Sequence, residues 1–134
     1  LFDEVFKVNV VAPLKIAESF LPHMEASQLK KFAIVSSSQG SIGTTRGPGL
    51  YIYRSSKAAV NMIGKILSYQ LKPKGIAVAL MNPGPVDTDM MKGLPKKMLR
   101  SPEDAARDMV QLADAANLEN TGTFWDFTGT VLPW

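Results

Sequence analysis

Two short runs of consecutive apolar residues constrain the fold of this chain more than any other feature. Residues 32–35 (FAIV) and 76–81 (IAVALM) are short, and both runs end in small polar or turn-forming residues. A continuous apolar run of this length is typical of a strand buried on both faces, as in a parallel sheet covered by helices. Both segments are therefore predicted to be strands of such a sheet.

Helical spacing surrounds the two runs. Apolar residues recur at steps of three and four over 2–21 and 52–71, which predicts two amphipathic helices. Pro13 is expected to bend the first of them, because its ring removes an amide donor and crowds the preceding turn. Ser101 is a typical N-cap, followed by Pro102 at the first helical position and by acidic residues, so a third helix begins there.

A last strand is expected over 123–127, which gives the order helix, strand, helix, strand, helix, strand. This alternation predicts an α/β layer structure with parallel strands. In such sheets ligands bind outside the carboxyl ends of the strands. The first two strands end there in unusual sequences, SSSQG at 36–40 and NPGPVDTD at 82–89.

The composition excludes several classes of protein. With 46% hydrophobic and 20% charged residues the chain is typical of a globular protein, and its net charge of +3 is scattered, so no nucleic-acid partner is expected. Cysteine is absent and His23 is the single histidine, so no metal site is expected. No apolar run approaches a membrane span and no signal peptide is evident. The expectation is a cytoplasmic protein without a membrane partner.

Tyr53 and Lys57 carry the first chemical signal. Residues four apart on a helix share one face, and an ammonium beside a phenol lowers the phenol pKa toward values useful for proton transfer. An amphipathic tyrosine beside a solvated lysine would show the same spacing. Tyr51 cannot share this geometry and is expected to pack in the loop. A serine hydroxyl from 36–38 would reach the same crevice and donate a hydrogen bond to a substrate oxygen.

Three motifs in order, VSSSQG, YRSSKAAVNM and NPGPVDTDM, resemble the downstream half of a short-chain dehydrogenase/reductase. The ending GTFWDFTGTVLPW is similar to the C-factor and sniffer-like carbonyl reductase branch of that family. The resemblance implies that residues 1–134 are a single partial domain, the C-terminal half of a Rossmann-like doubly wound parallel sheet. The N-terminal dinucleotide-binding half, with its phosphate loop, is absent from it. The strand near 32–37 would then have an unpaired edge.

The same resemblance implies a catalytic tetrad. Tyr53 exchanges a proton with the substrate oxygen, Ser37 steadies that oxygen, and Ser38 remains an alternative register for the serine. Lys57 lowers the tyrosine pKa and holds the nicotinamide ribose, while Asn9 supports a water-linked proton relay. Without the family match, Asn9 could equally be a polar residue that precedes the bend at Pro13.

The implied cofactor is NADP or NAD, with NADP slightly favoured. The family pattern P-G-x-[VI]-x-T is expected to place backbone groups and a hydroxyl against the nicotinamide. Together with the tyrosine and lysine, the implied cofactor-binding residues are Tyr53, Lys57, Pro83, Gly84, Val86 and Thr88. By themselves the last four could form a simple turn after the strand.

The function implied is hydride transfer between NAD(P)(H) and a carbonyl or alcohol substrate. The substrate pocket is expected to involve the 39–50 loop and the methionine-rich 87–100 segment. A homodimer or homotetramer through helices 2–21 and 52–71 is expected as well. The alternative is a truncated, non-catalytic interaction module that self-associates through the same two helices.

Overall fold

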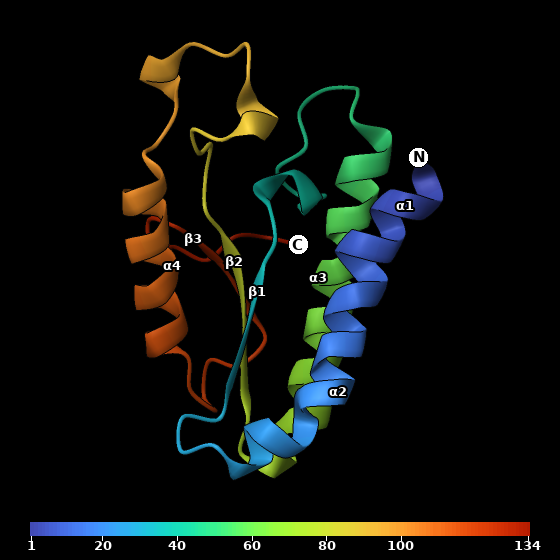
Figure 1. The fold of residues 1–134 in the computed structure, drawn as a ribbon, viewed down its shortest axis with the longest axis vertical. Helices are drawn as coiled ribbons and strands as arrows, with labels where there is room; N and C mark the ends of the chain where they lie inside the picture. The colour runs from blue at the N-terminus through green and yellow to red at the C-terminus, as the bar shows by residue number, and fades with distance from the viewer.

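A parallel sheet of three strands forms the centre of the molecule, a computed structural model that describes residues 1–134 (Figure 1). The strands are β1 (Lys31–Val35), β2 (Ala77–Asn82) and β3 (Thr123–Asp126), in the spatial order β1-β2-β3. Both pairings are parallel, with Lys31 opposite Ala77 and Ala79 opposite Thr123. The predicted α/β class with parallel strands is confirmed.

The first helical region is longer and less regular than its apolar pattern predicts. It consists of α1 (Phe2–Phe6), a π-helical turn (Lys7–Val11) and α2 (Ala12–Ala26). The predicted end at residue 21 is wrong by five residues, because the helix continues through Pro22. The irregularity expected near Pro13 appears as the π turn just before it, where Ala12 N donates to Lys7 O across the wider turn.

The two other long helices agree closely with the sequence pattern. They are α3 (Tyr51–Leu71) and α4 (Pro102–Ala115), and Ser101 Oγ accepts a hydrogen bond from Asp104 N at 3.1 Å as the predicted N-cap. None of the helices is both long and apolar enough to cross a membrane. Short 3₁₀ helices cover Ser38–Gly40, Lys72–Lys74, Asp89–Met91 and Lys96–Met98.

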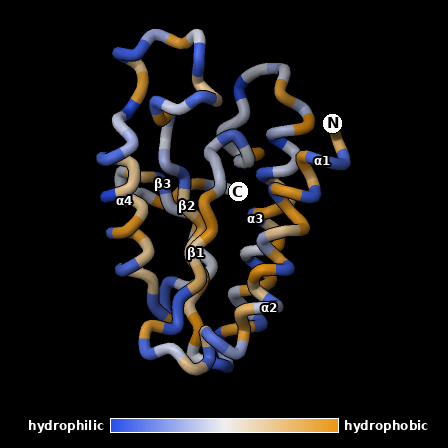
Figure 2. Tube along the Cα trace, in the orientation of Figure 1, coloured by the Kyte–Doolittle hydropathy of each residue, from blue (hydrophilic) through white to orange (hydrophobic).

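Helices cover both faces of β2, which is buried along its whole length. Val78 and Leu80 join a core with residues of α2, α3 and β3, whereas Ala77, Ala79 and Met81 form a second cluster with the end of α4. This alternation along one strand places apolar side chains in both layers. In the hydropathy view, β1 and β2 are accordingly mostly hydrophobic (Figure 2).

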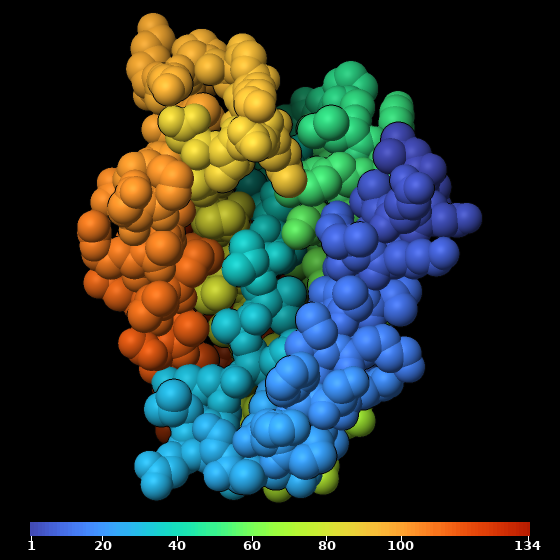
Figure 3. Space-filling view, in the orientation of Figure 1, coloured from blue at the N-terminus to red at the C-terminus, as the bar shows by residue number.

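The prediction that β1 is buried on both faces is wrong. Ile34 is buried, but Ala33 is exposed and the side chain of Val35 is 53% exposed. The cause is position, because β1 is an edge strand that pairs with β2 alone. The space-filling view shows β1 at the surface between α4 and α2 (Figure 3). The predicted unpaired edge is therefore present.

Candidate active site

The carboxyl ends of β1 and β2 lie at the same edge of the sheet, where the segments after them form two neighbouring turns (Figure 1). Ser36 Oγ donates to Asn61 Oδ1 at 2.5 Å and is thus engaged with α3. Ser37 is buried, and its Oγ accepts from Gln39 N at 3.1 Å. No hydrogen bond uses the Ser37 hydroxyl as a donor, so its proton remains available to a ligand.

Gly40 allows the serine turn, residues 37–40, to lie in close contact with α3. A Cβ placed on Gly40 would lie 2.6 Å from the backbone carbon of Lys57 and 2.9 Å from Ala58 N. Only glycine permits this approach, since backbone atoms of a helix cannot rotate away. The contact fixes the position of the Ser37 turn relative to the helix that carries Tyr53.

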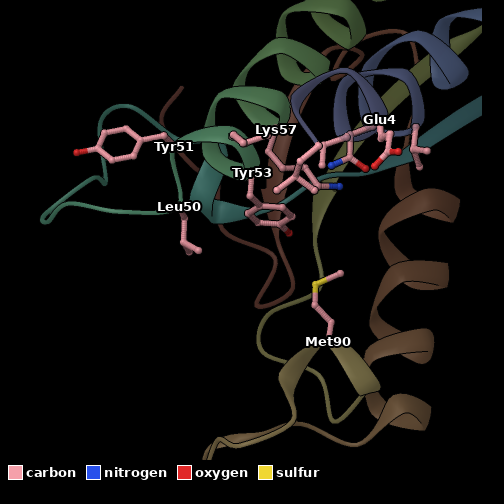
Figure 4. Close-up of a pocket in the computed structure, with 11 residues that line it drawn as sticks. Glu4, Leu50, Tyr51, Tyr53, Lys57 and Met90 are labelled. Carbon is pink, nitrogen blue, oxygen red and sulfur yellow. The ribbon is translucent and has the colours of Figure 1, made fainter.

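Tyr53 and Lys57 lie side by side in the first two turns of α3 (Figure 4). Lys57 Nζ is 5.8 Å from the centroid of the Tyr53 ring and donates to the carbonyl of Val35 at 3.3 Å. Burial lowers the pKa of Lys57 below its usual value, because a partly desolvated ammonium is disfavoured. Lys57 therefore bonds to the end of β1 and lies beside the Tyr53 ring.

The expectation that Tyr51 packs in the loop is wrong. Tyr51 is the first residue of α3, and its side chain is 79% exposed. Figure 4 shows its ring pointing away from Tyr53. Leu50, immediately before it, has a left-handed backbone with φ +55, which turns the chain sharply into the helix.

Asn9 reaches α3 from the π turn. Its Nδ2 donates to Ser56 Oγ at 3.0 Å, and Ser56 Oγ donates to the Tyr53 carbonyl at 2.7 Å. Ser56 is fully buried, so this chain of polar contacts lies between the two helices. π turns often occur at functional sites because they change the direction of a side chain.

A cavity of about 690 Å³ lies between α1, the start of α3 and the loop that carries Met90. Its polar lining includes Asn9, Tyr53 and Lys57. The remaining wall is apolar apart from Glu4 and Tyr51, and comprises Leu1, Val5, Val8, Leu50, Ile52 and Met90. Of the two predicted pocket segments, 39–50 and 87–100, only Leu50 and Met90 reach it.

The turn after β2 has backbone groups free for a ligand. Gly84 has φ +77, and a Cβ there would lie 2.7 Å from the Phe127 ring. Asp87 N donates to Arg100 O and Arg100 N donates to Pro85 O, so residue 86 lies between two bonded neighbours. The N–H and C=O of Val86 themselves make no hydrogen bond within the chain.

Arg100 holds this turn from the other side. Its Nη1 donates to Pro83 O at 2.6 Å, its Nη2 pairs with Asp108, and its guanidinium carbon lies 3.8 Å from the centroid of the Phe127 ring. Thr88 is exposed and borders a separate hollow of about 370 Å³. Four of the six predicted cofactor residues, Pro83, Gly84, Val86 and Thr88, therefore lie in one turn outside the larger cavity, whereas Tyr53 and Lys57 line that cavity.

Comparisons with known proteins identify the family of this chain. A family model described as short chain dehydrogenase matches residues 1–99. The C-signal protein of Myxococcus xanthus is 39% identical over 96% of this chain and 76% of its own length. The chain belongs to the short chain dehydrogenase family.

Solved structures of carbonyl reductases share the fold. NADPH-bound carbonyl reductase from chicken fatty liver superimposes with a TM-score of 0.91 at 27% identity, covering 99% of this chain and 57% of that protein. The carbonyl reductase Sniffer of D. melanogaster gives 0.84 at 30% identity over 96% of this chain and 55% of its own. This chain thus spans little more than half of the length of these two carbonyl reductases.

The structure brings together three of the four tetrad residues predicted from the short chain dehydrogenase resemblance. Asn9, Tyr53 and Lys57 line one cavity, while Ser37 lies buried at the adjoining turn. Their catalytic roles stay predictions. No group of three His, Asp or Glu side chains is placed to hold a metal ion.

Several residues that shape this site were not predicted from the sequence. Gly40 and Ser56 lie inside motifs in which only other residues were assigned a role. Arg100 immediately precedes the N-cap residue Ser101. The glycine that ends VSSSQG was the one available signal, because glycine often stands where two stretches of backbone approach closely. The contacts that matter for the other two, Asn9 with Ser56 and Pro83 O with Arg100, join residues 47 and 17 positions apart, so no local pattern indicates them.

Proposed function

We propose that this chain forms the catalytic and substrate-binding part of an NAD(P)-dependent oxidoreductase that interconverts a carbonyl compound and its alcohol. The observation that carries the proposal is that Tyr53, Lys57 and Asn9 line one cavity. The family membership and the carbonyl reductases of the same fold support it.

The residues present fit the nicotinamide end of a dinucleotide. The free N–H and C=O of Val86 match a carboxamide, which has one donor and one acceptor group. Lys57 Nζ uses one acceptor, Val35 O, and keeps donors for ribose hydroxyls. The NADPH bound to the chicken carbonyl reductase favours NADP over NAD. When bound, the reduced cofactor supplies a hydride to the carbonyl carbon.

Tyr53 then acts as the general acid. As the carbonyl carbon gains the hydride, the π electron pair moves to oxygen and the Tyr53 hydroxyl delivers a proton to it. The Ser37 hydroxyl donates a hydrogen bond to the same oxygen and stabilises its developing charge. The Lys57 ammonium stabilises the resulting phenolate, and a water held by Asn9 returns the proton. Alcohol oxidation follows the reverse order.

The substrate proposed for this site is an apolar carbonyl compound. Val5, Val8 and Ile52 offer no polar side-chain atoms, and Met90 is 77% exposed above the cavity. The exposed lid methionine is not packed against a helix and can adapt to substrates of different shape. Glu4 on the same wall disfavours anionic substrates near it by charge repulsion.

The test is a pair of tyrosine substitutions in the full-length protein. Tyr53→Phe is expected to lower kcat by about 10²–10⁴-fold with NADPH and aldehydes or ketones, because it removes the transferred proton. Tyr69→Phe is the matched control and is expected to leave kcat unchanged, because Tyr69 lies near the other end of α3 and does not line the cavity. Unchanged turnover in Tyr53→Phe would reject the mechanism.

We also propose that the protein self-associates as a homodimer or homotetramer through α1–α2 and α3. These helices expose a set of large apolar side chains outside the cavity: Val11, Ile16, Phe20, Met62 and Ile66. Exposed apolar surface of this extent is typical of an interface between proteins. Mass measurement after size exclusion tests the association, and a monomer at all concentrations would contradict it.

The second candidate function, a non-catalytic module that uses the same helices, is distinguished by cofactor titration. Saturable NADPH binding, followed by fluorescence, is expected if the protein is an enzyme. Self-association without any cofactor binding would favour the module. The two measurements are independent, because the apolar helix surface and the Val86 turn share no residue.

A further inference from the structure

Asn82 is the last residue of β2 and immediately precedes the Pro83-Gly84 turn. Its side chain is buried, with 5% exposed. A buried amide must satisfy its hydrogen bonds within the protein, because leaving them unmade destabilises the fold. Its partners therefore show what the residue holds in place.

The Asn82 amide makes hydrogen bonds at the carboxyl ends of all three strands. Its Oδ1 accepts from Ser38 N at 3.0 Å and from Gly84 N at 3.4 Å. Its Nδ2 donates to Asp126 Oδ1 at 2.8 Å, at the end of β3. The two backbone N–H groups can donate to the amide oxygen but not to the amide NH₂ group. The Asn82 amide therefore has one possible orientation.

Asp126 is itself held in place by hydrogen bonds to the residues that follow it. Its Oδ2 accepts from the Thr128 hydroxyl at 2.7 Å, and its backbone N–H donates to Thr130 O at 2.9 Å. The carboxylate therefore presents a fixed acceptor to the Asn82 amide. A charged acceptor strengthens this bond relative to a neutral one.

No backbone hydrogen bond joins the two turns of the site. The last bond between β1 and β2 is Ser36 N to Met81 O, and none links residues 37–40 with 83–88. The Asn82 side chain is thus the hydrogen-bonded connection between the serine turn, residues 37–40, and the proposed cofactor turn, residues 83–88. Ser38, which it holds, directly follows the predicted catalytic serine.

We propose that Asn82, oriented by Asp126, is a positioning residue that fixes the Ser37 turn relative to the Gly84–Val86 turn. The proposal rests on the oxidoreductase function proposed above. In the assembled site, a substrate oxygen must meet Ser37 while the nicotinamide lies against Val86. A single buried amide that bonds to both turns sets that separation.

The alternative is a role in stability alone, and Asn117 provides the matched control. Its Oδ1 also accepts two backbone N–H groups, from Glu119 and Asn120 at 2.9 Å, but it lies in the exposed loop before β3. In the full-length protein, Asn117→Ala and Asn82→Ala are both expected to lower the melting temperature. Only Asn82→Ala is expected to lower kcat/KM of the folded enzyme, by about 10²-fold for a misplacement near 1 Å.

An exchange of the two side chains gives the sharper test. Asn82→Asp places two carboxylates opposite each other and is expected to lower kcat/KM and to raise the KM for NADPH. Adding Asp126→Asn restores every bond, because the amide now donates from position 126 and the carboxylate accepts from Ser38 N and Gly84 N. The double variant is expected to return to within about threefold of the wild type, a coupling that distant residues do not show.

Amide hydrogen exchange decides the proposal independently of activity. Asn82→Ala is expected to speed exchange at both Ser38 N–H and Gly84 N–H, and the double exchange variant is expected to restore protection at both. Unchanged kcat/KM in folded Asn82→Ala, or faster exchange at only one amide, would overturn the proposal. If the wild type reduces no carbonyl, the proposed function fails, and the two exchange rates alone decide whether Asn82 links the turns.

Discussion

Replacing Gly40 by alanine would place a methyl group against the backbone of α3. The new Cβ would lie 2.6 Å from the Lys57 backbone carbon, 2.8 Å from its Cβ and 2.9 Å from Ala58 N. Carbon atoms in favourable contact are about 3.5–4.0 Å apart, so the turn must retreat by roughly 1 Å. The helix cannot yield, because its own hydrogen bonds fix these atoms.

This retreat has two consequences, one for stability and one for catalysis. Overpacking of this kind lowers the free energy of unfolding by about 1–3 kcal/mol. The same shift displaces Ser37, three residues earlier in the turn, and a misplacement near 1 Å reduces a catalysed rate by about 10²-fold. A 10²-fold fall in rate corresponds to about 2.7 kcal/mol, so both activity and stability are expected to fall measurably.

Urea unfolding and kcat/KM with NADPH measure the two effects in the full-length protein. Gly47→Ala is the matched control, because Gly47 lies in the same loop and a Cβ there meets nothing within 4 Å. Wild-type activity in Gly40→Ala would refute the reasoning, as would an equal loss in the Gly47 variant. A loss of stability without a loss of kcat/KM would show that the turn does not position the serine.

Three further predictions follow from single contacts. Burial lowers the pKa of Lys57, so the unfolded chain binds more protons between the folded pKa and the usual value of 10.5. The free energy of unfolding is therefore expected to rise with pH across that window, and to rise more steeply in the wild type than in Lys57→Met. Urea unfolding at several pH values measures this, and an equal dependence on pH in the two proteins would contradict it. Arg100→Met removes the bonds to Pro83 O and Asp108 and is expected to raise the KM for NADPH, with Arg100→Lys only partly restoring it. Ser101→Ala is expected to lower the free energy of unfolding by about 1 kcal/mol through the lost cap of α4, with unchanged kcat/KM.

The parts of the fold that depend on neighbouring residues in the chain were predictable. The N-cap at Ser101 is a local hydrogen bond, and the predicted helix begins where the structure has it. The pairing of Tyr53 with Lys57 needs only the helical repeat, which fixes residues four apart on one face. The two apolar strands were found as well, since their composition alone distinguishes them from the amphipathic helices.

The errors arose where burial or regularity depends on distant segments. Val35 is exposed because the edge of the sheet has no neighbour, which the apolar character of the run cannot show. The helix end near Pro22 was misplaced, because a proline ring weakens a helix without always ending it. Tyr51 entered the helix through the left-handed backbone at Leu50, a conformation that no residue type there would suggest.

The sequence by itself determined the alternating helices and strands, the helix face that carries Tyr53 and Lys57, and the Pro83-Gly84 turn after the second strand. Only the tertiary structure decided that Gly40 seats the serine turn on α3 and that the Asn82 amide joins it to Gly84. The physical reason is range. Helical periodicity and caps act between residues a few positions apart, whereas these contacts join residues 17 and 44 positions apart, which only the packed sheet and helix bring together.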